Sequence, residues 1–448
     1  MFEIKGRYTK AKVMIDNVEE SCISQIHTFV NHPVFTNPVA IMPDCHYGSS
    51  SCIGFTMELT DKVISNVIGV DIACGMLSIN IGKTVPISLE ELDRKIRLSV
   101  PFGQEVHDNS IINMKNDFPW RSVNSLAQKF SVAYQQRWGT HIQPPHYDMD
   151  WFTDKCDTIG GGQLRIINSL GTLGSGNHFC ELGVDENGDH WFTIHTGSRN
   201  FGKRICEYWQ NIAAKKIYKD KKLESQRDIE KAKETLSGKE LFNRIKEIKK
   251  NFNPGIKMTG LEWLEGNESI GYLYDMIFAQ EYASVNRQYI AKTVLNILGV
   301  ESQDQIETVH NFIDFRDFVI RKGAVRSYVG ERLIIPFNMR DGILICEGKS
   351  NPEWNCSAPH GAGRVMSRSK AKKTVNLDRF KQQMHGIFST SVGRGTLDEA
   401  PDVYKDCKVI EEAIGPTAKI LNRIKPIHNM KAAEDFKKRR KGKNELRG

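Results

Sequence analysis

The apolar residues of this chain fall into short runs, and that pattern limits the folds open to it. Each run is rich in Ile, Val, Phe or Thr and has glycine nearby. The runs lie at residues 63–82, 177–182, 191–198, 308–315 and 332–339. Runs of about four to eight such residues are typical of β-strands. The first run is longer, so we expect two strands there, separated by a turn at Asp71–Gly75.

Two other stretches, Phe201–Lys219 and Ser269–Leu298, have the pattern of helices. Residues 215–250 consist mostly of Lys, Glu and Arg around a thin apolar stripe. This pattern predicts a charged helical hairpin that protrudes from the core. We favour a solvated surface for it, and a role in gripping RNA is the alternative. The stripe consists of Ile229, Leu236, Leu241, Ile245 and Ile248.

The predicted strands and helices do not alternate with a regular βαβ period, and no internal repeat is visible. We therefore expect an α+β fold with mixed sheets in a single large domain over residues 1–436. The charged helical insertion is expected at about 203–255, and the short N-terminal segment is expected to pack onto the domain.

The net charge of +8 gives weak evidence about partners. Residues 437–448 contain seven basic residues and one acidic residue, so this segment alone contributes +6. Such a basic segment is expected to be a disordered tail. Only +2 is left for the rest of the chain, and a nucleic-acid partner cannot be argued from net charge alone.

The compartment follows from what the sequence lacks. No stretch approaches the ~20 consecutive apolar residues of a membrane-spanning helix, and residues 1–16 have no apolar core of signal-peptide type. The ten cysteines are scattered without a CxxC pair, which is typical of free thiols in a reducing compartment. We expect a cytoplasmic protein with no membrane segment.

Several potential metal ligands lie beside tight, glycine-containing turns. A single histidine in a strand is more often a hydrogen-bonded structural residue than a ligand. Asp71 and Cys74 differ, because a carboxylate and a thiolate three residues apart around a turn can face one cavity. Mixed Asp, Cys and His donors suit Mn²⁺, Zn²⁺ or Co²⁺ better than Ca²⁺, and residue type does not decide between them. The candidates are Asp71, Cys74, His178, His195, His310 and His360.

Phosphate-binding features lie next to these candidates. The segment GTLGSGNH (171–178) could wrap a phosphate with backbone N–H groups, or it could be an ordinary hairpin turn. Arg199 follows His195 by four residues, and its guanidinium suits bidentate phosphate contacts. Arg364 and Arg368 begin a basic segment that could meet an RNA backbone.

His360 lies between Pro359 and Gly361, a position expected to be exposed and conformationally constrained. A neutral imidazole there could attack a nucleotide phosphate.

Seven motifs, found in family order from about residue 40 to residue 432, resemble those of the RtcB family, the tRNA-splicing or 3′-phosphate RNA ligases. Such an ordered set makes accidental similarity improbable. The motifs are MPDCHYG (42–48), GVDIACG (69–75), GSGNHFCEL (174–182), HTGSR (195–199), HN (310–311), HGAGR (360–364), and APDVYKD followed by IKPIHNMK.

The resemblance implies sheets around a metal and nucleotide cleft, and a role for each matching residue. Two Mn²⁺ ions would be held by Asp71, Cys74, His178, His195 and His310, with Cys74 bridging. His360 matches the histidine that takes GMP from GTP. Asn177 and Arg199 match contacts to nucleotide or RNA phosphates. The guanine pocket would be lined by Phe179, Glu181, Tyr404 and Lys431, with Glu181 selecting guanine through its N1 and N2 donors.

The implied activity joins RNA 2′,3′-cyclic phosphate or 3′-phosphate ends to 5′-hydroxyl ends through a guanylylated histidine, in RNA repair or tRNA splicing. The partners would be such RNA ends and an accessory activator protein. One loop departs from the family: IPFNMRDG (335–342) stands where serines are common, with Asn338 replacing one of them near the nucleotide.

Two other functions remain open from the residues alone. A two-metal RNA phosphatase or nuclease would need the metal ligands but not His360 or Lys431. A non-catalytic RNA-binding protein would use the basic segments and would have no need for the ligand set.

Overall fold

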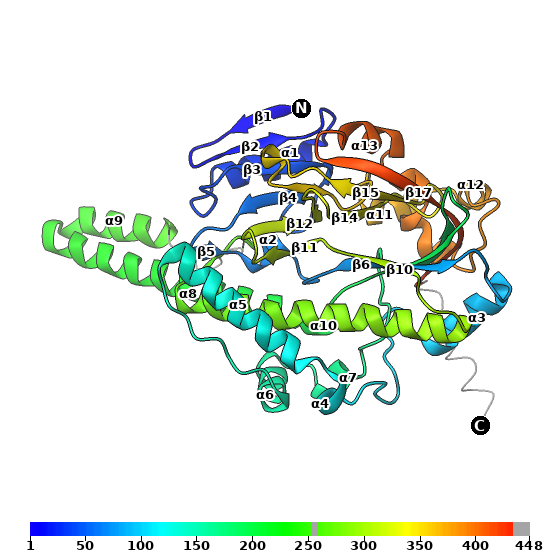
Figure 1. The fold of residues 1–448 in the computed structure, drawn as a ribbon. Helices are drawn as coiled ribbons and strands as arrows, with labels where there is room; N and C mark the ends of the chain where they lie inside the picture. The colour runs from blue at the N-terminus through cyan, green and yellow to red at the C-terminus, as the bar shows by residue number, and fades with distance from the viewer. Residues whose placement is uncertain (252–258, 433–448) are drawn as a thin grey trace, which may run out of the picture.

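The fold combines helices with several sheets, as the sequence predicted, but only one of the two large sheets is mixed. In the computed structural model, which describes residues 1–251 and 259–432, one sheet has six strands and another seven (Figure 1). The six-stranded sheet has the order β1 (Phe2–Lys5), β2 (Lys10–Val13), β3 (Val39–His46), β4 (Ile53–Glu58), β12 (Val319–Lys322) and β11 (Asn311–Asp314). Strands β2 and β3 are parallel and the other pairs are antiparallel. The N-terminal segment therefore joins the domain as the first two strands of this sheet, with β1 at its edge.

The seven-stranded sheet is antiparallel throughout and carries most of the predicted motifs. Its order is β10 (Asp304–Val309), β6 (Gly75–Gly82), β8 (His190–Thr196), β7 (Phe179–Val184), β17 (Ala418–Lys431), β15 (Ile343–Gly348) and β14 (Arg332–Pro336). Two small sheets pair β13 (Ala324–Arg326) with β16 (Ser357–Pro359), and β5 (Lys62–Val63) with β9 (Leu264–Glu265).

Helices cover the sheets, and the longest buried one is α10 (Asn267–Leu298), which runs beneath the strands in Figure 1. Its Phe278 is fully buried in an aromatic cluster with Phe118, Phe152 and Phe201. Burying such a side chain stabilises the fold by about 1.5–3 kcal/mol. The other helices are α1 (Glu20–Val30), α2 (Ser65–Ile68), α3 (Leu89–Ser99), α4 (Met114–Asp117), α5 (Trp120–Trp138), α6 (Met149–Ile159), α7 (Gln163–Ile167), α8 (Arg199–Thr235), α9 (Gly238–Asn251), α11 (Arg368–Thr374), α12 (Leu377–Gln383) and α13 (Cys407–Ala413), with short 3₁₀ turns at Pro352–Trp354, Arg394–Glu399 and Pro401–Val403.

Helices α8 and α9 form the predicted charged hairpin, which leaves the body of the molecule in Figure 1. The first four turns of α8 are anchored by buried residues such as Phe201 and Trp209. Beyond Ala213, the only buried residue of α8 is Ala232. The predicted insertion (203–255) ends among residues that the structure does not describe. The predicted tail (437–448) lies wholly outside the described residues. Among the described helices, none is long and apolar enough to cross a membrane.

Two strand predictions were wrong in detail. The first apolar run of 63–82 contains only a two-residue strand and then helix α2, because the Ser65 hydroxyl is fixed by hydrogen bonding to Gln210 Oε1 (2.9 Å) and Gly69 turns the chain with φ = 120°. The run 308–315 forms two strands in different sheets, β10 and β11, which are separated at His310.

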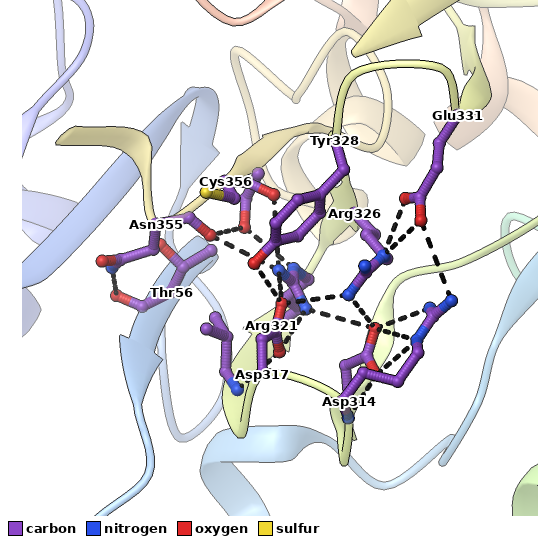
Figure 2. Close-up of polar contacts among 12 residues, drawn as sticks. Thr56, Asp314, Asp317, Arg321, Arg326, Tyr328, Glu331, Asn355 and Cys356 are labelled. Atoms are coloured by element: carbon purple, nitrogen blue, oxygen red, sulfur yellow. Dashed lines mark hydrogen bonds and ion pairs between the residues drawn. The ribbon is translucent and has the colours of Figure 1, made fainter. Parts of the chain in front are cut away.

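A buried charge cluster fastens β11 and β12 to the segment that precedes His360. Arg321 on β12 is fully buried and pairs with Asp317 (2.7 Å), and its Nε donates to Ser357 Oγ (2.8 Å) (Figure 2). Its guanidinium also donates to the backbone oxygens of Asn355 and Cys356. Both of those residues have left-handed φ angles, 48° and 45°, a conformation that costs non-glycine residues free energy. Arg321 therefore holds a strained turn three residues before the end of β16.

We expect Arg321→Met to lower the free energy of unfolding by about 3–5 kcal/mol, because the buried carboxylates of Asp314 and Asp317 would lose their buried cation. Arg316→Met is the matched control: it removes a cation that also pairs with Asp314 but is 64% exposed, so a loss below about 1 kcal/mol is expected. Chemical denaturation monitored by fluorescence measures both. Equal losses in the two variants would contradict the structural role given to Arg321.

Candidate active site and metal centre

Most of the predicted site residues line one cavity of about 820 Å³. Its walls come from the turn before β6, the strands β7, β8 and β17, and the segment after β16. The predicted residues on its surface are Asp71, Cys74, Asn177, Phe179, Glu181, His195, His310, Asn338, His360, Arg364, Arg368, Tyr404 and Lys431. His178 and Arg199 lie behind this surface.

The candidate metal ligands meet because of the sheet order. Cys74 and His178 directly precede β6 and β7, while His195 lies near the end of β8 and His310 directly follows β10. In an antiparallel sheet, the starts of some strands and the ends of their neighbours share one edge. The neighbouring strands β10, β6, β8 and β7 therefore bring all four residues to the same edge of the sheet.

The donor atoms form two groups that share one thiol. Cys74 Sγ lies 3.3 Å from His195 Nε2, which lies 3.2 Å from His310 Nε2. On the other side, Cys74 Sγ lies 3.5 Å from His178 Nε2, which lies 3.0 Å from Asp71 Oδ2. Each group offers three donor atoms within 4.8 Å of one another. This arrangement fits two metal ions with Cys74 between them.

The turn that carries Asp71 and Cys74 is fixed by hydrogen bonds, including one from helix α10. Cys74 N–H donates to Asp71 O (3.2 Å), and Ala73 between them has a left-handed φ of 54°. The buried Arg287 of α10 donates to Ala73 O (2.9 Å) and to Thr196 O (3.0 Å). One guanidinium thus fixes the two backbone segments that carry Cys74 and His195.

The protonation states favour a cation. Burial and the repulsion of neighbouring positive groups hold the pKa of His195 and of His310 well below the usual range, so both rings are neutral, as ligation of a metal would require. Burial, reinforced by Asp71, raises the pKa of Cys74. Burial acts to raise the pKa of Asp71 as well, but hydrogen bonding to His178 and the charge of Arg199 leave it below its ordinary value. A divalent cation would displace the thiol proton.

The sequence suggested that His360 would be exposed. In the structure it lies in the cavity wall, with its side chain only 15% exposed. Its Nδ1 is 2.7 Å from Oδ2 of the fully buried Asp44, and its ring lies 4.7 Å from the ring of His310. Lys405 Nζ donates to the backbone oxygens of Pro43 and Cys45, on either side of Asp44. The side chain is thus fixed, with Nε2 left for chemistry.

A second part of the cavity is built by neighbouring residues of β7 and β17. Glu181 pairs in register with Asn429, whose Nδ2 donates to Glu181 Oε2 (2.7 Å). The other oxygen of Glu181 has no hydrogen-bond partner among the described residues. Burial raises the pKa of Glu181 to about 8. The ammonium of Lys431 lies 5.1 Å from the ring centre of Phe179.

Glu399 forms ion pairs with the cationic side chains of this region. It is buried and pairs with Lys431 (2.8 Å), Arg368 (2.5 Å) and Arg364 (3.4 Å), and it accepts a hydrogen bond from Tyr404. Burial opposes its ionisation, but Lys431 and the two arginines hold the pKa of Glu399 at about 2. Glu399 is therefore a fixed anion beneath three fixed cations.

Two predicted contact residues have other partners in the structure. Arg199 Nε donates to Thr172 Oγ1 (3.0 Å) beneath the Gly-rich segment, where a Cβ at Gly174 would overlap its guanidinium. The amide of Asn338 is occupied within its own turn: Oδ1 accepts from the N–H groups of Arg340 and Asp341, and Nδ2 donates to Asp341.

Sequence reasoning missed Asp44, Arg287 and Glu399. Asp44 stood inside the motif MPDCHYG, and its carboxylate next to a proline was the available signal. Nothing local marked Arg287 or Glu399, because their partners lie far away in the chain.

Comparison with known proteins agrees with this geometry. A family model described as tRNA-splicing ligase RtcB matches residues 25–432. The chain belongs to the RtcB family. It is 28% identical over 436 residues to the RNA-splicing ligase RtcB of Escherichia coli (strain K12), covering 92% of this chain and 94% of that protein.

Archaeal members of the RtcB family are also similar over most of their length. The tRNA-splicing ligase RtcB of Methanococcus maripaludis is 26% identical over 455 residues, covering 91% of this chain and 90% of that protein. For the tRNA-splicing ligase RtcB of Nanoarchaeum equitans the identity is 24% over 487 residues, covering 94% and 93%.

We expect Cys74→Ala to reduce bound Mn²⁺ far more than loss of one terminal ligand, because Sγ belongs to both donor groups. His178→Ala should weaken one of two sites. Cys180→Ala, which removes another buried thiol of the same sheet, is the control and should keep both ions. Equilibrium dialysis with metal analysis measures the number bound. Unchanged binding in Cys74→Ala would refute the shared-thiol arrangement.

Proposed function

We propose that this chain is a GTP- and Mn²⁺-dependent RNA ligase that joins 2′,3′-cyclic phosphate or 3′-phosphate ends to 5′-hydroxyl ends through guanylylated His360. One observation carries the proposal. A histidine held by a buried carboxylate faces the same cavity as two donor groups suited to metal ions. A two-metal phosphatase or nuclease that activates water would not need a histidine nucleophile.

His360 is suited to act as a nucleophile. With Asp44 accepting the Nδ1 proton, the lone pair lies on Nε2. Attack forms a bond from Nε2 to the α-phosphorus of GTP and breaks the bond from that phosphorus to its bridging oxygen, so pyrophosphate leaves. The carboxylate of Asp44 offsets the positive charge that develops on the ring. A neutral nucleophile also avoids repulsion by the triphosphate.

Asp71, Cys74 and His178 would hold one Mn²⁺ ion, and Cys74, His195 and His310 the other. Bound there, the ions would supply polarisation of phosphate oxygens and offset charge on nucleophile and leaving group. The protein's own contribution is to keep His195 and His310 neutral and to hold the Cys74 turn in place through Arg287.

The guanine base would lie against Phe179 and Tyr404, with Glu181 accepting from its N1 and N2 donors. The unpartnered buried oxygen of Glu181 supports this assignment, since a buried acceptor without a partner costs free energy that a ligand can recover. Asn177 and Lys431 would contact the nucleotide, while Arg364 and Arg368 would meet RNA phosphates.

The RNA reaction has three steps. Water first opens a 2′,3′-cyclic phosphate, breaking the bond from phosphorus to the 2′-oxygen and leaving a 3′-phosphate. An oxygen of that phosphate then attacks the GMP on His360, and the N–P bond breaks. Finally the 5′-hydroxyl attacks the activated 3′-phosphate, loses its proton and displaces GMP. The family resemblance also implies an accessory protein that activates the ligase.

Incubation with α-labelled GTP and Mn²⁺ should label the wild-type chain with an acid-labile phosphoramidate. His360→Ala should abolish the label. Asp44→Asn should slow labelling by about 10²–10⁴-fold, because a neutral amide cannot offset the ring charge and its N–H can donate to Nδ1, which would move the ring proton to Nε2. The exposed His141→Ala is the control. Full labelling of His360→Ala would rule out this nucleophile.

GTP affinity should depend on pH through Glu181. Below pH 8 the free carboxyl is mostly protonated, and acceptance from guanine requires loss of that proton. Affinity should therefore rise up to tenfold per pH unit from pH 6 and level off above about 8. Calorimetric titration of the His360→Ala chain avoids turnover, and adding Glu181→Gln should flatten the profile. A flat profile with Glu181 present would contradict this role.

A further inference from the structure

We propose that the α8–α9 hairpin is an arm that binds the double-helical part of the RNA substrate, through one lysine-bearing side of α8. The inference rests on the proposed ligase function for the identity of the substrate. It assigns a surface to substrate recognition that lies outside the cavity.

The net positive charge of the folded part of the chain is concentrated in the hairpin. Residues 215–250 contain thirteen basic and seven acidic residues, a net charge of +6. Residues 437–448 contribute another +6, so the remainder of the chain must carry −4 to reach the total of +8. A body with net negative charge repels RNA, and an arm with net positive charge attracts it. The total charge of the chain conceals this separation.

The charges of α8 are also arranged by side. Lys215, Lys219, Lys222 and Lys233 are spaced by four, three and eleven residues, which places them on one side of a helix. All four are exposed, and none has a carboxylate partner in residues 1–251 and 259–432. The opposite side mixes three acids with three bases: Asp220, Glu224, Asp228, Lys221, Arg227 and Lys231.

The arm is rooted firmly beside the active site. The first residue of α8, Arg199, lies beneath the Gly-rich segment of the site. Farther along, Lys216 pairs with Glu268 (2.7 Å) at the start of α10 and with Glu265 (3.6 Å) of β9. The arm beyond it is stiffened by the apolar contact between α8 and α9, in which Ala232 and Ile248 are buried.

The mouth of the cavity reaches the base of this arm. Tyr47, Gly48 and Ser49 line the cavity, and Tyr47 is 52% exposed. The next residue, Ser50, lies against Gly260, whose carbonyl accepts from Asn66 Nδ2 (3.2 Å). Gly260 follows the hairpin closely in the chain. RNA leaving the cavity over Tyr47 would therefore arrive at the root of α8.

The dimensions suit a duplex. The exposed part of α8, from Lys215 to Thr235, spans about 30 Å at 1.5 Å per residue, close to one turn of a double helix. Double-stranded RNA is recognised mainly by its shape and phosphates. Lysines spaced along one side of a helix suit contacts with phosphates better than they suit recognition of the base sequence of the RNA.

Two variants with the same change in charge test the proposal. Lys215/Lys219/Lys222→Gln removes three cations from the proposed RNA side, and Lys221/Arg227/Lys231→Gln removes three from the opposite side. Glutamine keeps helix propensity high. Ligation is measured for one pair of RNA ends, either on short single strands or next to a stem of about 15 base pairs, across a salt series. Binding of the stem RNA alone is followed by fluorescence anisotropy.

The first variant should raise KM for the stem substrate about tenfold or more at low salt. It should also reduce the slope of log affinity against log salt by about 2 to 3, since each lost phosphate contact removes close to one unit. Ligation of short strands, labelling by GTP and the opposite-side variant should be unchanged.

Equal effects of both variants, or no effect of the stem on the wild type, would overturn the proposal. If the wild type neither ligates nor accepts GMP, the ligase function fails instead, and the anisotropy measurement still decides whether the arm binds RNA duplexes.

Discussion

The thiol of Cys74, placed between two imidazoles, is the contact on which the rest of the site depends. The thiol shares its surroundings with three histidines and a carboxylate, a donor set that suits a cation, and the buried Nδ1 atoms of His195 and His310 have no hydrogen-bond partner among the described residues. The fold brings these donors together at strand ends rather than in loops. Four neighbouring strands position the candidate ligands, and Arg287 fixes the one turn that strand pairing does not reach.

Around this centre, buried carboxylates hold three cations in place. Arg364, Arg368 and Lys431 all contact Glu399, and Arg368 also contacts Asp398 (2.8 Å). The carboxylates hold the three cations at fixed positions before substrate arrives. Such preorganised charge does not have to reorient as a reaction proceeds. The same contacts lower the desolvation cost of burying the cations.

Local motifs could be read from the sequence, whereas distant contacts could not. Each candidate metal ligand sits in its own short motif beside a strand, so residue type and spacing were enough to nominate it, and the structure brings the nominated donors together. The bond between Asp44 and His360 joins residues 316 positions apart, and no periodicity reveals it. The helix at Ser65–Ile68 was missed because its apolar run resembles a strand, and its contact with Gln210 becomes visible only in three dimensions. Asn338 lines the cavity as the sequence suggested, but the hydrogen bonds that its amide makes within its own turn could not be read from the sequence.

The position of His310 explains why His360 and the candidate metal ligands can share one cavity although different sheets carry them. The chain leaves the seven-stranded sheet at Val309 and enters the six-stranded sheet at Asn311. His310 occupies the junction, and its carbonyl accepts from Gly323 N–H (2.6 Å), next to the small sheet that leads to His360. A change in how the two large sheets meet would therefore move His360 relative to Cys74. Arg321 resists that change by tying β12 to the segment before His360, so its buried charge supports the geometry of the site through the junction of the sheets.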